Sequence, residues 1–161
     1  MKGKIVIADA STLIGLLRIG QLSLLKKLFE EIIIPRGVYD EVVVKRKEGS
    51  DIFKKSTYII VKDVEDRVST DFLMPSFGKG EAEVLALAKE KKADLILLDE
   101  KRARKTARRA GFKVMGILGI LIISKDKGFI ASVKPFIEKL NRQGFRLSDK
   151  VIKRTLKETR E

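Results

Sequence analysis

Four acidic residues are the side chains of this sequence whose type and spacing could do chemistry: Asp9, Glu41, Glu81 and Asp99. Each stands at or just beyond an apolar segment, and these segments should pack beside one another. Carboxylates gathered in one place repel one another and raise each other's pKa, so a cluster of them is costly unless a cation occupies it. Oxygen ligands alone favour a hard cation, Mg²⁺ or Mn²⁺. We therefore predict a metal site built from these four acids.

The composition restricts both the chemistry and the partners. The 161 residues include no histidine and no cysteine, which excludes imidazole and thiolate ligands, so any catalysis must rest on carboxylates, hydroxyls, lysines or a metal. Lysine and arginine number 35 against 22 acidic residues, a net charge of +13. A chain this basic suits a polyanionic partner such as RNA or DNA, with an anionic membrane surface as the competing interpretation.

Nothing in the sequence predicts a membrane-spanning segment. The longest apolar run covers residues 116–123, far short of the roughly 20 residues that a spanning helix needs. The basic start of the chain is followed by an apolar run that Asp9 interrupts, so it does not resemble a secretion signal. We expect a cytoplasmic protein.

Short apolar runs alternate with helical patterns along the chain. Strands are predicted at residues 5–8, 32–34 and 95–98, with further strands at 58–61 and 113–115. This alternation predicts an α/β fold of three layers, α/β/α, around a central, mainly parallel sheet, with extra C-terminal helices. We expect a single domain over residues 1–161, with a core of about 1–124 and a helical extension of about 125–161. Residues 63–80, rich in glycine and proline breakers, are predicted to be the least regular stretch.

The predicted fold brings the acids to one edge of the sheet. Ligands of open parallel sheets bind at the carboxyl ends of the strands, where Asp9 and Asp99 lie. Glu81 begins a helix after a glycine turn, and Glu41 lies on the helix that follows the second strand. Each acid also has a structural alternative: Asp9 and Asp99 could cap helices, Glu81 could favour a helix N-terminus, and Glu41 could be a solvated surface charge.

The same residues carry a resemblance to a known family. The segments IVIADAS (5–11), IIIPRGVYDEV (32–42), GKGEAEVLALA (78–88) and LILLDEKRARKTARRAGFKVMGILGIL (95–121) resemble PIN-domain ribonucleases, particularly the VapC-like toxins and a related prokaryotic branch. The resemblance implies that Asp9, Glu41, Glu81 and Asp99 are the four family acids, catalytic and metal-binding, and that Ser11 is the hydroxyl residue that supports the first. Glu81 replaces the more common Asp, and Leu97 replaces a hydroxyl often found two residues before the fourth acid.

The resemblance also implies a reaction and partners. We expect an endoribonuclease that uses Mg²⁺ or Mn²⁺ to hydrolyse RNA phosphodiester bonds, with the toxin of a toxin–antitoxin pair as a further expectation. The alternative is a catalytically weak or inactive PIN-like module for RNA binding or assembly. A small antitoxin and a homodimer are the expected protein partners, and the apolar stripe of Val151, Ile152, Thr155 and Leu156 belongs either to the core or to such a contact.

The densest basic run follows the fourth acid directly. A helix over residues 100–110 spreads these charges over its surface, which suits contacts to backbone phosphates more than base recognition. An ordinary solvated helix is the alternative interpretation. The predicted nucleic-acid-binding residues are Lys101, Arg102, Arg104, Lys105, Arg108 and Arg109.

Overall fold

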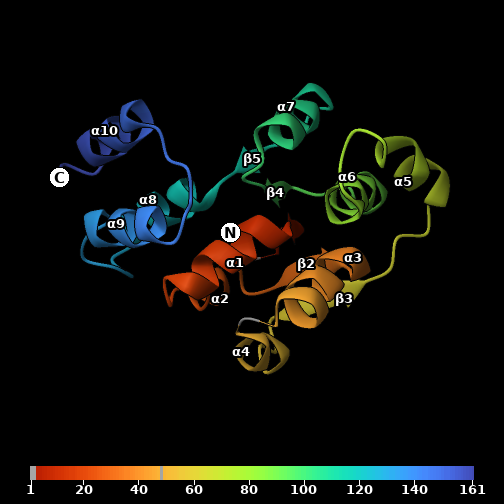
Figure 1. Cartoon of the computed structure of the whole chain (residues 1–161), viewed down its shortest axis with the longest axis horizontal. Coiled ribbons are helices and arrows are strands. Elements are labelled where there is room, and N and C mark those ends of the chain that lie inside the picture. Colours follow the sequence, from red (N-terminus) through yellow and green to blue (C-terminus); the bar gives the residue numbers. More distant parts are fainter. Residues whose placement is uncertain (1–2, 48) are drawn as a thin grey trace.

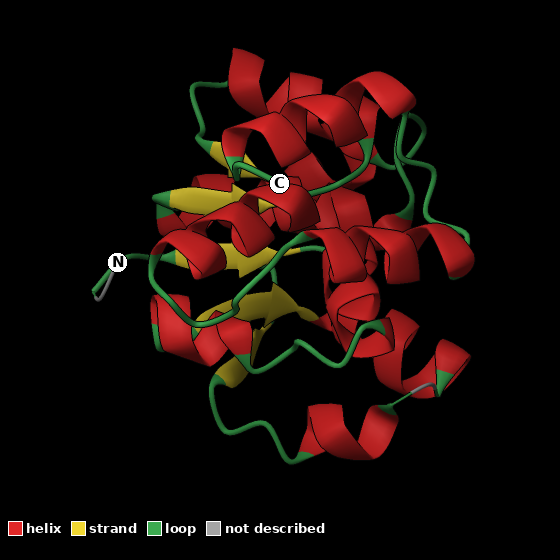
Figure 2. Ribbon diagram, turned by 90° about the vertical axis from the view of Figure 1, so that its left-hand side faces the viewer, coloured by secondary structure: helices red, strands yellow, loops and turns green. Residues whose placement is uncertain are grey.

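A five-stranded parallel sheet forms the centre of the molecule, in a computed structural model that describes residues 3–47 and 49–161. The strand order is β3-β2-β1-β4-β5, and every neighbouring pair is parallel. Figure 2 shows the strands stacked in one direction with helices around them. The strands are β1 (Val6–Ala8), β2 (Ile32–Pro35), β3 (Ile59–Lys62), β4 (Leu95–Leu97) and β5 (Val114–Met115).

Helices cover both faces of this sheet (Figure 1). On one face α2 packs on β2 and on α8, which also contacts α1, whereas α6 packs on β1 and β2 from the other face and contacts α5 and α7. The predicted three-layer α/β/α fold is therefore confirmed. The helices are α1 (Ala10–Arg18), α2 (Leu24–Phe29), α3 (Arg36–Tyr39), the π-helix η1 (Asp40–Arg46), α4 (Ser50–Lys54), α5 (Arg67–Leu73), α6 (Lys79–Lys91), α7 (Lys101–Arg109), α8 (Ile117–Asp126), α9 (Lys134–Arg142) and α10 (Asp149–Glu158).

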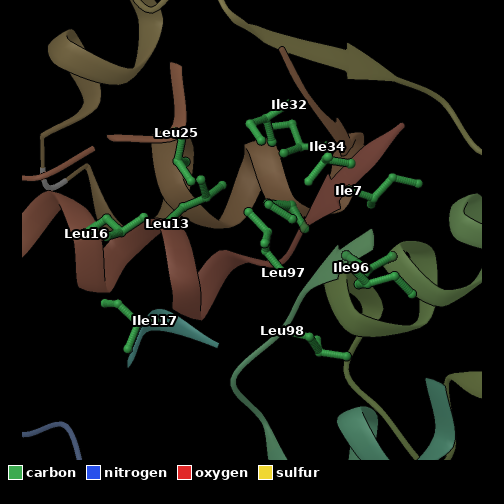
Figure 3. Close-up of a cluster of buried hydrophobic side chains, with 14 of the residues drawn as sticks. Ile7, Leu13, Leu16, Leu25, Ile32, Ile34, Ile96, Leu97, Leu98 and Ile117 are labelled. Carbon is green, nitrogen blue, oxygen red and sulfur yellow. The ribbon is translucent and has the colours of Figure 1, made fainter. Parts of the chain in front are cut away.

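The core lies where the apolar strands meet the helices. Ile7, Ile32, Ile34 and Ile96 are fully buried in the sheet, and Leu13 of α1 belongs to the same hydrophobic core (Figure 3). Fully burying such a side chain contributes roughly 1.5–3 kcal/mol each. Strands buried on both faces read as continuous apolar runs, which is why the pattern of the sequence predicted them.

Two segments differ from the secondary structure expected from the sequence. The prediction of an irregular stretch at 63–80 was wrong in part, because residues 67–73 form α5, which Asp66 begins by accepting a hydrogen bond from the backbone N–H of Ser69 at 3.0 Å. The helix that carries Glu41 is a π-helix, η1, rather than a continuation of α3. Both differences are local, and neither changes the order of the strands.

The apolar stripe on α10 lies largely against the core. Thr155 is buried, and Ile152 and Leu156 are half-buried against the hydrophobic core, whereas Val151 stays exposed. Ser148 begins this helix by accepting a hydrogen bond from the N–H of Val151 at 3.2 Å. Among the helices that the structure describes, none is both long and apolar enough to cross a membrane.

Candidate functional site

The register of the two central strands places Asp9 and Asp99 together. Ala8 at the end of β1 pairs with Leu97 at the end of β4, so the residues that follow both strands meet at the carboxyl edge. The backbone N–H of Asp9 donates to the carbonyl of Leu97 at 2.9 Å. The helices after β1 and β4 leave toward opposite faces, and the crevice at such a switch point is where open α/β sheets bind ligands.

Hydrogen bonds hold the two carboxylates in place. One oxygen of Asp9 accepts from the N–H of Thr12 at 2.8 Å, which makes Asp9 the N-cap of α1, and the other accepts from the N–H of Asp99 at 3.3 Å. Asp99 accepts from the Thr12 hydroxyl at 2.6 Å and from the N–H of Ile117 at 3.1 Å. Thr12 thus bridges both acids. Each carboxylate oxygen keeps a further lone pair for another ligand.

Burial and mutual repulsion make this pair reluctant to ionise. Burial, followed by the charge of Asp99, raises the pKa of Asp9 to about 7. Burial also raises the pKa of Asp99, against the opposing effects of the Thr12 hydroxyl, the Ile117 N–H and the Arg104 charge. A cation bound between the two groups would relieve both penalties, since an opposite charge favours the ionised form.

Glu81 lies in the first turn of α6, as expected, but its charged neighbour is another acid. Burial raises the pKa of Glu81 first, the nearby charge of Glu100 raises it further, and Arg102 opposes the shift. Glu100 caps α7 by accepting from the N–H groups of Arg102 at 3.1 Å and Ala103 at 2.6 Å. The residue that caps this helix is therefore Glu100, and not Asp99 as the structural alternative held.

Glu41 is turned toward basic side chains of its own helix. It accepts from Nε of Arg46 at 3.3 Å and lies 3.8 Å from Nζ of Lys45. Its side chain is 33% exposed, so these contacts are open to water. The structure thus pairs Glu41 with cations of the protein itself.

The four acids do not gather into one group. Within residues 3–47 and 49–161, no three carboxylates lie close enough together to hold a metal ion. Asp9 and Asp99 are brought together, Glu81 lies beside Glu100, and Glu41 is paired with Arg46. The pair nevertheless fits a hard cation, because Mg²⁺ is commonly bound through one or two carboxylates and completes its octahedron with waters and substrate phosphates.

Two residues beside the acids were not predicted from the sequence. Ser11, the hydroxyl expected to support Asp9, is exposed, and the hydroxyl that reaches the acids belongs to Thr12. The spacing of Thr12, three residues after an acid that starts a helix, is the signal that could have indicated it. Glu100 directly follows Asp99, and its place before a basic helix was likewise visible in the sequence.

The predicted basic helix, α7, lies beside this site. Arg104 is close enough that Asp9 and Asp99 raise its pKa, although burial and the charge of Arg108 have the larger effects and lower it. A guanidinium stays charged despite such a shift. Arg102 faces elsewhere, with its guanidinium 5.7 Å from the ring centre of Phe77. The helix therefore presents some of its charges toward the acids and others away from them.

The comparisons with known proteins agree with this geometry. A family model described as a PIN domain matches residues 5–161. Among curated proteins none matches the chain. Because the match covers nearly the whole chain, the protein belongs to the PIN-domain family, whose fold is that of a nuclease.

Proposed function

We propose that this protein is a nuclease that hydrolyses RNA with the help of Mg²⁺ or Mn²⁺. The observation that carries the proposal is the Asp9–Asp99 pair, a buried and a half-buried carboxylate in contact through the N–H of Asp99 at the carboxyl ends of the central strands. No lysine or arginine forms an ion pair with either of them among the described residues. Two neighbouring carboxylates without a cation of the protein beside them are better explained as a site for a divalent ion than as structural side chains.

The residues of the chain have separate parts in this proposal. Asp9 and Asp99 would hold the ion, and Thr12 orients Asp99 through its hydroxyl. Glu81, beside Glu100, would accept a proton or hold a water molecule. Arg104 faces the charge of the scissile phosphate. Ser11 lies in the wall of the adjoining groove, and Glu41 serves the site from a greater distance. When bound, Mg²⁺ or Mn²⁺ would supply electrostatic stabilisation of the phosphate and lower the pKa of a water molecule.

Cleavage of a long single-stranded RNA with and without Mn²⁺ tests the proposal. Asp9→Asn keeps the size of Asp9 and one oxygen that can accept from the N–H of Thr12, but it removes the charge. We therefore expect the rate to fall by at least about 100-fold, more than the loss of an outer-sphere partner causes. Asp71→Asn, the same change at an exposed position of α5, is the matched control and should cleave as the wild type does. Equal cleavage by Asp9→Asn and the wild type, both well folded by circular dichroism, would refute the assignment.

A second candidate is a PIN-like module that binds RNA without cleaving it. It is favoured by the separation of the acids, because Glu41 is engaged by Arg46 and does not join the pair. Titration with Mn²⁺, followed by thermal unfolding, separates the two functions. A wild-type protein that gains no stability at millimolar Mn²⁺ supports the binding module.

The roles of toxin, antitoxin partner and homodimer remain predictions for this chain. Exposed apolar side chains such as Val68 and Phe72 on α5 are available for contact with another protein. Light scattering of the purified protein measures the expected dimer directly. Co-purification with the product of an adjacent small reading frame tests the antitoxin.

A further inference from the structure

A large groove adjoins the Asp9–Asp99 pair. Its volume is about 1280 Å³, and its lining includes Asp99, Glu100 and Gly116 beside the acids. Helix α7 provides one wall, and residues 144–158, which include α10, provide the opposite wall. Figure 1 shows α7 and α10 on the two sides of the segment that joins β5 to α8. The groove therefore connects the site with the C-terminal part of the chain.

Both walls of the groove are basic. Seven lysine and arginine residues line it, against three acidic ones. Lys101, Arg104 and Arg108 come from α7, whereas Arg146 and Arg154 come from the opposite wall. Among the described residues, neither Arg146 nor Arg154 forms an ion pair. Like charges that face each other across a hollow repel, and a polyanion between them would remove that repulsion.

The groove divides the basic residues of α7 into two sets. Lys101, Arg104 and Arg108 follow the spacing i, i+3, i+7 and line it, which places them on one face of the helix. Arg102, Lys105 and Arg109 do not line it, so only half of the six predicted nucleic-acid-binding residues face the groove. The sequence could not separate these sets, because six of the nine residues of α7 are basic.

The opposite wall is held firmly on the rest of the protein. Phe145 packs against α1 at Gly15. A Cβ added to Gly15 would lie only 2.7 Å from the Phe145 ring, so the contact requires a glycine there. Glu161 accepts from the N–H of Val133 at 2.9 Å and from Nζ of Lys125 at 3.0 Å, which ties the end of α10 to α8 and α9. Burial would raise the pKa of the Glu161 carboxyl, but hydrogen bonds from the Ser132 hydroxyl, from the N–H groups of Val133 and Lys134 and from Lys125 together lower it well below its usual range. A wall fixed in advance loses little entropy when a ligand binds.

We propose that this groove binds a single strand of RNA between α7 and residues 144–158, and that Arg146 and Arg154 contact backbone phosphates away from the cleaved bond. The proposal rests on the nuclease function and adds the C-terminal wall to the substrate site. The volume is slightly above the roughly 300–1,000 Å³ of small-molecule pockets, which is enough for a few nucleotides of a single strand. Phosphate contacts of this kind give salt-dependent binding with little sequence preference.

Binding of a fluorescein-labelled single-stranded 12-nucleotide RNA, followed by fluorescence anisotropy in EDTA, tests the groove without cleavage. Arg154→Gln should weaken binding by about 5-fold at 100 mM salt and reduce the slope of log K against log salt by about 0.7, the loss of one phosphate contact. Lys153→Gln is the matched control, because it removes the same charge from the next residue of α10, which is exposed and outside the groove. The affinity of Lys153→Gln for the RNA should stay within about 2-fold of that of the wild type. Arg146→Gln with Arg142→Gln as its control repeats the comparison outside α10.

The outcomes separate this inference from the nuclease proposal. If Arg154→Gln and Lys153→Gln lose the same affinity for RNA, RNA does not bind in the groove, even if the wild type cleaves RNA with Mn²⁺. A loss specific to Arg154 supports the groove even if no cleavage is found, and the nuclease proposal then fails alone. A 12-base-pair RNA duplex that competes as well as the single strand would overturn the assignment to a single strand. A wild-type protein that binds polyglutamate but no RNA would overturn the assignment to RNA.

Discussion

Two acidic side chains, Glu83 and Asp9, are buried in the part of the chain that the structure describes, and their surroundings differ in one respect. Glu83 on α6 is fully buried, accepts from the N–H of Gly37 at 2.7 Å and pairs with Nη1 of Arg67 at 3.1 Å. Asp9 is only 2% exposed and also accepts backbone N–H groups, but its charged neighbour is the acid Asp99. One buried acid has its own cation, and the other has a second acid.

This difference distinguishes a structural acid from a candidate metal ligand. A buried charge is tolerated when a partner and hydrogen bonds compensate for lost water, which Arg67 and Gly37 do for Glu83. Nothing in the described part of the chain does this fully for Asp9, because Arg104 acts only from beyond ion-pair distance. The incomplete compensation is a cost that a bound cation would offset.

The largest expected effect is on stability at different pH. Because the pKa of Asp9 is about 7 in the folded protein and 3.8 ordinarily, the folded state binds this proton more tightly. The proton on Asp9 therefore stabilises the folded state fully below pH 3.8, and this stabilisation is lost as the pH rises through 7. The total change in unfolding free energy is at most about 4 kcal/mol. Urea unfolding in EDTA should therefore show Asp9→Asn gaining stability over the wild type from pH 4 to pH 8.

Mn²⁺ provides the control for this prediction. It should stabilise the wild type more at pH 8 than at pH 5, and should have little effect on Asp9→Asn, because the ion competes with the proton for the carboxylates. A constant difference in stability between the two proteins from pH 4 to pH 8 would contradict the burial of the Asp9 carboxyl beside Asp99.

The next largest effect is the loss of stability expected when Glu83 loses its ion-pair partner, Arg67. Arg67→Leu leaves a buried carboxylate without its partner, and we expect unfolding free energy to fall by about 2 kcal/mol, less than for a fully buried pair because the Arg67 side chain is 52% exposed. Arg36→Leu removes an exposed ion pair with Asp63 and should cost less than about 1 kcal/mol. Denaturation with urea measures both, and a loss in Arg67→Leu that Mn²⁺ reverses would remove the contrast with Asp9.

Loss of the Thr12 hydroxyl should lower the rate of cleavage by about 10-fold, the size expected for an outer-sphere partner. Thr12→Val removes the donor to Asp99, whose pKa then rises further because that hydrogen bond lowers it. The acid limb of the pH–rate profile should move to higher pH, whereas Thr12→Ser should retain the wild-type profile. An unshifted profile in Thr12→Val would show that the hydroxyl does not act on the reacting group.

The smallest effect is expected for Glu41. Like Glu83 it has cations of its own, Arg46 and Lys45, but at a partly exposed position where such pairs contribute little. Cleavage by Glu41→Gln should stay within about 3-fold of the wild type. A fall in the cleavage rate as large as that of Asp9→Asn would instead indicate that Glu41 binds the metal together with Asp9.

The sequence predicted the sheet well because its signals are local. Strands buried on both faces are continuous apolar runs, and Ser148 and Pro35 stand at helix starts as their side chains require. The placement of Asp9 and Asp99 also followed, since it depends only on their position after two strands that pair. The confirmed fold rests on these features.

What could not be predicted depends on side-chain direction. Glu41 lies on a π-helix, and the extra residue per turn changes where a side chain points without a clear mark in the sequence. Thr12 was overlooked beside Ser11 because only the start of α1 decides which hydroxyl turns inward. Arg146 and Arg154 join the groove through the packing of Phe145 on Gly15, a contact between residues far apart in the chain.

The contact between Gly37 and Glu83 has an evolutionary consequence. A Cβ at position 37 would clash with Oε2 of Glu83, so the missing side chain of one residue is the space that holds the carboxylate of the other. Neither position can change freely alone. Among relatives of this chain, we expect a residue larger than glycine at position 37 only together with a shorter side chain at position 83, so that the two columns of an alignment vary as one.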